Sequence, residues 1–255
     1  MRSRTVVVAI INQKGGVGKT TTSTNLAHAI AKTGKKITLI DLDPQGHLGV
    51  SFGVVNPKLP GVNEVMLGKY KITECLIPVR DNLQMLVAGS RLQEIEQLSE
   101  GGVNRGHLLR KALYKQCLDQ DFIFIDCPPS SGLLVANALF AADEILIPMT
   151  SDFLALQGLS HMMGTIKRFE TALQKKYRLF LVMSRYASTR RISKEVLSTL
   201  LAHFPEQVLY TVIRETALLA ECPSFGKTIL DYRPRSRSAR DFKALAQDFL
   251  QQKVM

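Results

Sequence analysis

The sequence lacks the features typical of disulfide-stabilised, zinc-binding and membrane-spanning proteins. It has four cysteines, none of which forms a CxxC pair, and no histidine lies at zinc-finger spacing from one. This pattern argues against a disulfide framework or a structural zinc site and is typical of a reducing cytoplasm. No apolar run approaches the roughly 20 residues that a membrane-spanning helix needs. The apolar run at residues 6–11 leads into a glycine-rich loop with no cleavage site, so it fits a buried strand better than a signal peptide.

What the sequence does have is enough apolar material for a core and a large surplus of positive charge. Hydrophobic residues make up 45% of the 255 residues, which excludes disorder as the main state. There are 33 Lys and Arg against 22 Asp and Glu, a net charge of +11. A surplus of this size predicts an anionic partner such as nucleic acid, anionic lipid or a phosphate compound.

Apolar runs of strand length alternate with longer segments of helical periodicity. We expect strands at residues 6–11, 37–41, 83–87, 122–126, 144–148 and 179–184, and helices at 20–32, 106–117, 132–140, 157–175 and 193–203. This alternation predicts an α/β fold with a mostly parallel twisted sheet and helices on both faces. Residues 52–78 are expected to form irregular or short-helical cover. No repeat or linker interrupts the chain, so we expect residues 1–255 to form a single domain without an N-terminal helix-turn-helix domain.

The strongest chemical signal is a glycine-rich loop between the first expected strand and helix. Residues 13–20 read Gln-Lys-Gly-Gly-Val-Gly-Lys-Thr, a loop that can turn tightly and point successive backbone N–H groups at phosphates. Lys19 would reach the β- and γ-phosphates, the Thr20 hydroxyl would bind Mg²⁺, and Thr21 would reach the α-phosphate. The residues expected to line the phosphates are Lys14, Gly15, Gly16, Val17, Gly18, Lys19, Thr20 and Thr21.

Three aspartates stand at the carboxyl ends of expected strands. Asp41 ends one strand and Asp43 follows two residues later, while Asp126 ends the apolar run Phe-Ile-Phe-Ile. Ligands of open α/β sheets bind at this edge, and an aspartate that ends an apolar strand has the form of a Walker B motif. A surface turn remains the alternative reading for the Asp-Pro-Gln-Gly stretch after residue 42.

The loop resembles the deviant Walker motif of the family that contains the ParA and Soj partition ATPases, MinD and the nitrogenase iron protein. The resemblance implies a P-loop NTPase fold and places Lys14 across a dimer interface, at the nucleotide of the other subunit. It also implies that Asp43 orients the attacking water, which makes Lys14, Lys19 and Asp43 the expected catalytic residues. Thr20, Asp41 and Asp126 are the residues it assigns to Mg²⁺. The iron protein is disfavoured because its cluster cysteines have no counterparts here.

Most of the positive surplus lies in the last third of the chain. Residues 166–243 hold 16 Lys and Arg against 7 Asp and Glu. A solvated charged surface without a partner would explain this surplus, but arginines of these regions bind DNA non-specifically in ParA-like ATPases. The resemblance therefore assigns DNA contacts to Arg185, Arg190, Arg191, Arg214, Arg235 and Arg237. It also places Pro223 and Ser224 near the adenine.

The sequence thus indicates an Mg²⁺-dependent ATPase that dimerises on ATP, binds DNA without sequence preference and drives chromosome or plasmid partition. A ParB-like partner is expected to stimulate its weak hydrolysis, in the bacterial cytoplasm and on the nucleoid. Three alternatives remain: a MinD-like regulator held at the membrane by its amphipathic C-terminal helix, a nucleotide-switched positioning factor for a large machine without DNA binding, and a generic P-loop kinase. We expect no membrane partner, because an amphipathic stripe usually packs on its own core and the tail carries two acids.

Overall fold

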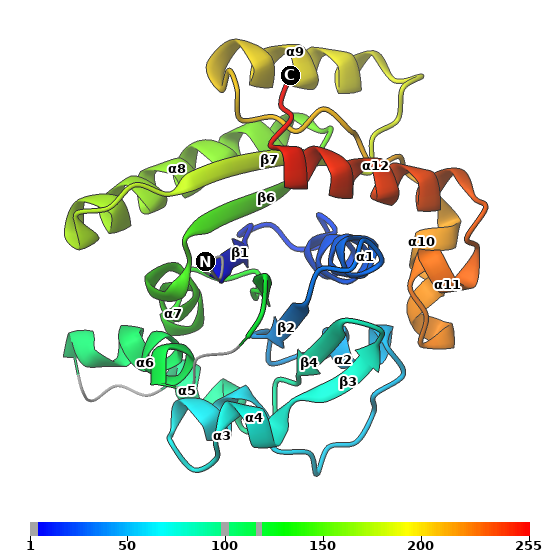
Figure 1. Ribbon diagram of the computed structural model, residues 1–255. Helices are drawn as coiled ribbons and strands as arrows, with labels where there is room; N and C mark the ends of the chain where they lie inside the picture. The colour runs from blue at the N-terminus through cyan, green and yellow to red at the C-terminus, as the bar shows by residue number, and fades with distance from the viewer. Residues whose placement is uncertain (1–4, 98–101, 116–118) are drawn as a thin grey trace.

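The computed structural model describes residues 5–97, 102–115 and 119–255, and a seven-stranded sheet lies at its centre (Figure 1). The strands lie in the order β3-β4-β2-β5-β1-β6-β7. All neighbours pair in parallel except β3 and β4, which are antiparallel. The strands are β1 (Val6–Ile10), β2 (Ile37–Asp41), β3 (Ile77–Arg80), β4 (Leu83–Leu86), β5 (Phe122–Asp126), β6 (Glu144–Thr150) and β7 (Arg178–Ser184).

Helices cover both faces of this sheet and bury two apolar cores. One core lies under α1 (Lys19–Ala31), α11 (Ile229–Tyr232) and α12 (Arg237–Gln251). The other lies under α3 (Val62–Met66), α4 (Ile72–Cys75), α5 (Leu92–Gln97), α6 (Leu108–Lys115), α7 (Leu133–Ala141), α8 (Phe153–Leu173) and α9 (Arg191–His203). The remaining described elements are the short helices α2 (His47–Ser51) and α10 (Ala217–Glu221) and the 3₁₀ turns η1 (Gly102–His107) and η2 (Cys222–Phe225).

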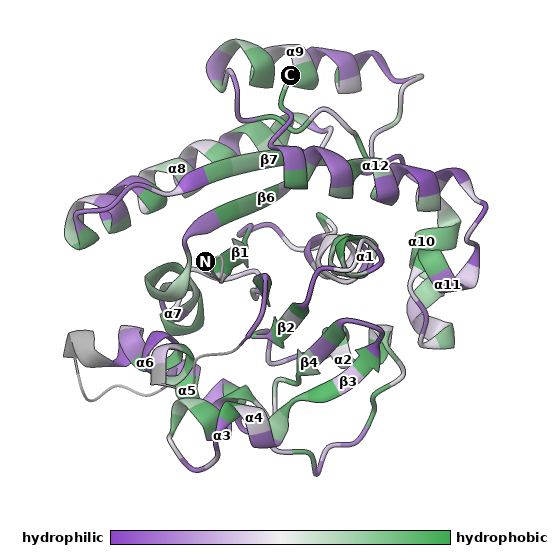
Figure 2. Cartoon of the chain, viewed as in Figure 1, coloured by the Kyte–Doolittle hydropathy of each residue, from purple (hydrophilic) through white to green (hydrophobic). Residues whose placement is uncertain are grey.

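The central strand β1 explains why the expected strands are apolar throughout. Val7 and Ala9 point into one core, whereas Val8 and Ile10 point into the other. Successive side chains of a strand face opposite sides of the sheet, so a strand covered on both sides is apolar at every position. In Figure 2 the central strands are mostly green, and the loop from α11 into α12 is purple.

The apolar face of the amphipathic C-terminal helix packs against the protein's own core. Phe242, Leu245, Ala246 and Phe249 of α12 are buried in the core shared with α1. The Phe249 ring contacts the rings of three sheet residues at centroid distances of 5.4–5.9 Å: Phe122, Phe124 and Phe180. This packing removes the apolar face that a MinD-like membrane anchor requires. Among the described helices none is long and apolar enough to cross a membrane.

The expected α/β fold and its six parallel strands are confirmed, with shifts of one or two residues at some ends. The helix expected from residue 157 begins at Phe153, because the Asp152 carboxylate caps it by accepting a hydrogen bond from the Ala155 amide at 3.1 Å. The expectation for residues 52–78 is correct for α3 and α4 but misses the edge strand β3. The expected end of α6 at Cys117 lies outside the described residues.

Candidate functional site: a phosphate-binding loop at the carboxyl edge of the sheet

The glycine-rich loop joins β1 to α1 at the carboxyl edge of the sheet. Gly16 and Gly18 have φ angles of +73° and +86°, a region that favours glycine, so the loop needs these residues for its turn. Lys19 is buried, and its ammonium donates a hydrogen bond to the Lys14 carbonyl at 3.2 Å. Burial lowers the pKa of Lys19 against the opposing effect of Asp126 and Asp43. The loop therefore has the shape and the lysine that a triphosphate requires.

Thr20 and Asp126 come together below this loop. The Thr20 hydroxyl donates to Asp126 Oδ2 at 2.7 Å, and the Ser23 hydroxyl donates to Oδ1 at 2.7 Å. Burial raises the pKa of the Asp126 carboxyl to about 6, although both hydroxyl donors and Lys19 act against the rise. A hydroxyl beside a buried carboxylate is the oxygen donor pair that Mg²⁺ takes from a P-loop NTPase, so these residues fit the ion. Ser23 was not among the expected site residues.

Asp41 and Asp43 lie at the end of β2 and in the turn after it, and their side chains have different surroundings. Both oxygens of the buried Asp41 accept backbone amides, from Asp43 at 3.1 Å and from Leu48 at 3.1 Å. Burial, with the neighbouring Asp126, raises the pKa of Asp41 well above its ordinary value. Asp43 instead lines the large hollow that the phosphate loop also lines. The geometry thus suits Asp43 for a role at the nucleotide and gives Asp41 a bracing role in this turn. The described residues contain no group of three acidic, histidine or cysteine side chains that could hold a metal by themselves.

Lys14 does not line the hollow that contains Lys19. Its ammonium lies 2.7 Å from Asp152 Oδ1 and 2.8 Å from Oδ2, and Thr150 donates to the same carboxylate at 2.6 Å. The Lys14 side chain remains 37% exposed. It lines a separate surface hollow with Gly15, Gly16, Thr150 and Asp152. Asp152 stands 138 residues away in the chain, and the sequence carried no signal that pairs it with Lys14.

The wall opposite the phosphate loop comes from a segment in which the sequence singled out Arg214 alone, as a DNA contact. A hollow of about 740 Å³ runs from the loop to the segment 213–220, and Ser184 lies between them. The Ser184 hydroxyl donates to the Val17 carbonyl at 2.6 Å, so the end of β7 is fastened to the loop. The short parallel pairing of Tyr186 with Arg214 places this segment beside β7, and this pairing was not evident from the sequence.

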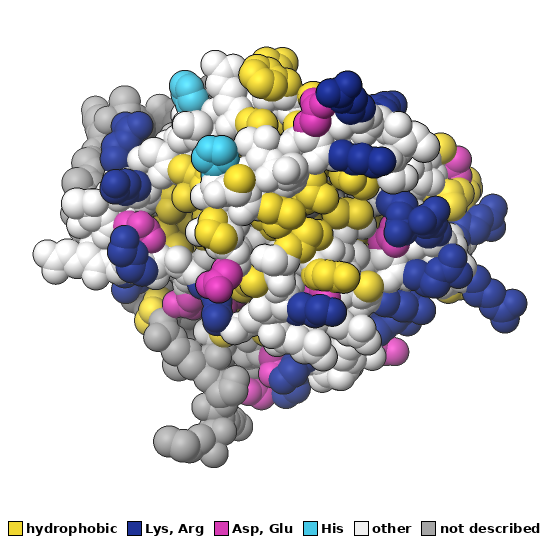
Figure 3. Space-filling model, turned by 90° about the horizontal axis from the view of Figure 1, so that it is seen from above, with side chains coloured by type: hydrophobic (Ala, Val, Ile, Leu, Met, Phe, Trp, Pro, Cys, Tyr) yellow, Lys and Arg dark blue, Asp and Glu magenta, His cyan; other side chains and the backbone are white. Residues whose placement is uncertain are grey.

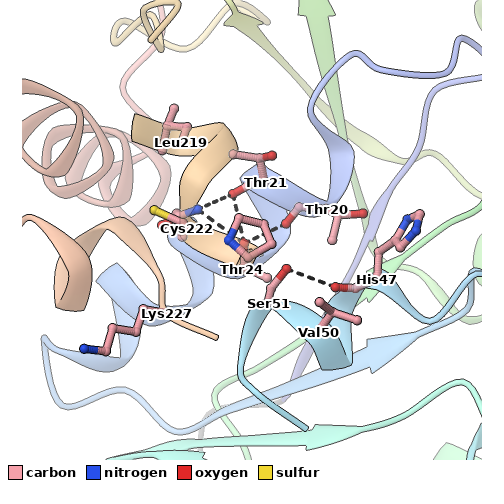
Figure 4. Close-up of a pocket in the computed structure, with 11 residues that line it drawn as sticks. Thr20, Thr21, Thr24, His47, Val50, Ser51, Leu219, Cys222 and Lys227 are labelled. Carbon is pink, nitrogen blue, oxygen red and sulfur yellow. Dashed lines mark hydrogen bonds between the residues drawn. The ribbon is translucent and has the colours of Figure 1, made fainter. Parts of the chain in front are cut away.

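A smaller hollow of about 250 Å³ adjoins the first one and lies between α1, α2 and η2 (Figure 4). Thr20, Thr21, His47 and Leu219 line both hollows. Pro223, expected near the adenine, lines the smaller hollow, whereas Ser224 lines neither. The structure therefore brings Pro223, but not Ser224, to a hollow beside the phosphate loop.

The structure separates the six arginines expected at DNA into two groups. Arg191, Arg235 and Arg237 are exposed, and the side chain of Arg191 is 92% accessible. Arg185 and Arg214 line the large hollow, paired with Glu215 and Asp241 respectively. Arg190 is also exposed and approaches Glu215 at 3.4 Å.

Proteins similar to this chain in sequence include chromosome-partitioning proteins. Residues 5–179 match a family described as an AAA domain. The chromosome partitioning protein ParA of Myxococcus xanthus is 36% identical over 249 residues, which cover 96% of this chain and 87% of the relative. This chain belongs to the ParA/Soj family. The chromosome-partitioning ATPase Soj of Thermus thermophilus is 35% identical, with 98% of this chain and 97% of Soj covered.

Solved structures show that the fold is shared with nucleotide-binding proteins of known structure. A Mycobacterium smegmatis protein described as cobyrinic acid a,c-diamide synthase, solved with ADP and magnesium, has a TM-score of 0.83 and 31% identity, with 97% of this chain and 95% of that chain covered. A Borrelia burgdorferi putative plasmid partition protein bound to AMPPNP has a TM-score of 0.85 at 23% identity, with 98% and 100% covered. The expected nucleotide and magnesium are thus the ligands that the M. smegmatis relative binds.

Proposed function

We propose that this ParA/Soj-family chain is an Mg²⁺-dependent ATPase that dimerises on ATP, binds DNA non-specifically as the dimer and partitions a chromosome or plasmid. ATP hydrolysis, slow until a ParB-like partner stimulates it, returns the dimer to monomers that leave the DNA. The proposal places the protein in the bacterial cytoplasm, on the nucleoid. In this account Lys19, Thr20 and Asp126 hold Mg²⁺-ATP, and Asp43 orients the attacking water. Mg²⁺ supplies charge neutralisation at the phosphates when it is bound.

The observation that carries dimerisation is the position of Lys14. This lysine belongs to the phosphate loop, yet its ammonium lies outside the large hollow and rests on Asp152. A partly exposed ion pair of this kind contributes at most about 1 kcal/mol, so a triphosphate presented by a second copy can compete for Lys14. A charge-assisted hydrogen bond to phosphate is stronger than the bond it replaces. ATP then stabilises the dimer, because Lys14 of each copy neutralises the nucleotide of the other.

The exposed basic residues that follow α11 support the DNA part of the proposal. Figure 3 shows a dense group of Lys and Arg side chains at its right edge, with others spread over the rest of this face. The exposed arginines of this C-terminal cluster are Arg233, Arg235, Arg237 and Arg240. A cluster of exposed cations suits contacts with DNA phosphates, and such contacts carry no base readout.

The test is DNA binding by the Asp43→Ala variant, which is expected to hold ATP without hydrolysing it. Fluorescence anisotropy with two labelled duplexes of unrelated sequence should show binding with Mg²⁺-ATP and little with ADP or without nucleotide. Affinity should be equal for the two duplexes and should fall linearly with the logarithm of salt concentration. Binding that is absent with ATP, or confined to one duplex, would contradict the proposal. A Lys14→Ala, Asp43→Ala double variant provides the control, because it should stay monomeric and lose DNA affinity.

A further inference from the structure

Arg185 lies at the phosphate loop, apart from the C-terminal cluster. One guanidinium nitrogen donates to the Gly16 carbonyl at 3.3 Å, and another donates to Glu215 Oε1 at 3.0 Å. Arg185 lines both the large hollow with Lys19 and the neighbouring hollow with Lys14. It therefore stands on the ridge between these two hollows, within hydrogen-bond distance of the loop backbone.

The backbone around Arg185 is held in a conformation that few arginines adopt. Its φ angle is +50°, in the left-handed region, where a residue other than glycine is strained. Two anchors keep it there. The preceding Ser184 donates to the carbonyls of Val17 and Met149, and the following Tyr186 donates its amide to the Ile213 carbonyl at 3.0 Å. The fold thus fixes the origin of the Arg185 side chain beside the loop.

The position of Lys19 shows which part of a triphosphate would lie near Arg185. The lysine of a P-loop reaches the β- and γ-phosphates, and here its ammonium rests on the Lys14 carbonyl, two residues before Gly16. The β/γ end of the nucleotide therefore belongs at residues 14–16, where Arg185 makes its contact. Three cations line the large hollow, namely Lys19, Arg185 and Arg214, and Arg214 is tied to the buried Asp241. Arg185 and Lys19 are the pair left for the phosphates.

Arg185 can exchange its ion pair with Glu215 for a phosphate with little loss of stability. The Arg185 side chain is 57% exposed and that of Glu215 is 36% exposed, so their ion pair contributes little. Glu215 also retains Arg190 at 3.4 Å if Arg185 leaves. A triphosphate carries more negative charge than this single carboxylate, which favours the exchange.

We propose that Arg185 is a phosphate-binding residue of the nucleotide site, held by Glu215 until ATP arrives, and that it favours ATP over ADP instead of contacting DNA. This inference rests on the ATPase function proposed above and adds a residue to that same site. It reassigns an arginine that the sequence had placed among the DNA contacts.

The test measures binding of ADP and of a non-hydrolysable ATP analogue to the full chain by calorimetry, with Mg²⁺ present. Arg185→Gln should weaken the ATP analogue about tenfold or more and ADP clearly less, because a charged hydrogen bond to phosphate is lost. Arg185→Lys should recover part of the affinity for the analogue. Glu215→Gln should keep it within about twofold of the wild type, because Arg185 is only released. The exposed Arg191→Gln is the matched control and should change neither affinity. Thermal unfolding of each variant verifies that it is folded.

Either of two nucleotide-binding results would overturn this assignment. One is an Arg185→Gln variant that retains the wild-type ratio of ATP to ADP affinity. The other is an equal loss of affinity for the ATP analogue in Glu215→Gln and Arg185→Gln, which would show that the ion pair stabilises the site without Arg185 binding phosphate. DNA binding at saturating ATP analogue should be unchanged in Arg185→Gln, and a selective loss there would restore its DNA role. If the wild type itself discriminates nucleotides but binds no DNA, the proposed function fails while this inference stands.

Discussion

Replacing the buried Asp126 by asparagine should stabilise the ligand-free protein while removing its response to Mg²⁺-ATP. The carboxyl is 1% exposed, and its pKa is raised from 3.8 to about 6 by burial. Because the folded state holds a proton that the unfolded state releases, stability falls as the pH rises from about 4 to about 6. A pKa difference of this size corresponds to about 3 kcal/mol of lost stability at pH 7. Asparagine has nearly the same shape and no charge, so it should recover much of this loss.

The assay is urea unfolding in EDTA at several pH values between 4.5 and 8. The wild type should lose stability across the lower part of this range, and Asp126→Asn should show a flatter profile and a higher free energy of unfolding at pH 7. Mg²⁺-ATP should stabilise the wild type and have little effect on the variant, which lacks the carboxylate beside Thr20. The exposed Asp119→Asn serves as the control and should change stability by less than about 0.5 kcal/mol.

A less stable Asp126→Asn variant at pH 7 would refute this reasoning. It would show that the hydrogen bonds from Thr20 and Ser23 outweigh the cost of burying the charge. The predicted result would instead mean that the chain retains a destabilising carboxylate for its function at the metal.

Two further predictions concern the C-terminal segment. Gly226→Ala should lower the free energy of unfolding by about 2 kcal/mol or more, because Gly226 has a φ of +59° and an added Cβ would lie 2.7 Å from the Gly53 Cα. Thermal unfolding checks it, and Gly158→Ala, in an open position of α8, should not destabilise the protein. Arg235→Ala and Arg237→Ala should each weaken ATP-dependent DNA binding for all sequences and reduce the salt slope by about 1. Titrations of two duplexes at several salt concentrations check this prediction. The control Arg91→Ala, which lies outside the cluster, should bind DNA as the wild type does. A loss of affinity that depends on the DNA sequence would contradict the prediction.

The sheet and the phosphate loop could be predicted because both are local in sequence. Buried parallel strands are continuous apolar runs, and the loop carries its glycines, lysine and threonine in consecutive positions. The edge strand β3 was not predicted because it is short and half-exposed and contains Pro78, which weakens the sequence pattern of a strand. Its pairing with β4 across a tight turn is what makes it a strand.

The parts of the site that could not be predicted depend on contacts between distant segments. Asp152 meets Lys14 across 138 residues, and Ser184 meets Val17 across 167. Arg185 was grouped with neighbouring arginines because charge along a sequence does not reveal which way each side chain points. The fold turns Arg185 toward the loop and leaves Arg191 exposed, so one basic stretch serves two surfaces.

The mass of the Asp43→Ala protein in solution, measured by light scattering after gel filtration, tests the central claim most directly. With Mg²⁺-ATP the mass should be twice the 28.3 kDa of one chain, and with ADP it should be that of one chain. Adding Lys14→Ala should return the ATP sample to the monomer mass. A monomer of Asp43→Ala with bound ATP, or a dimer that persists without Lys14, would contradict the account.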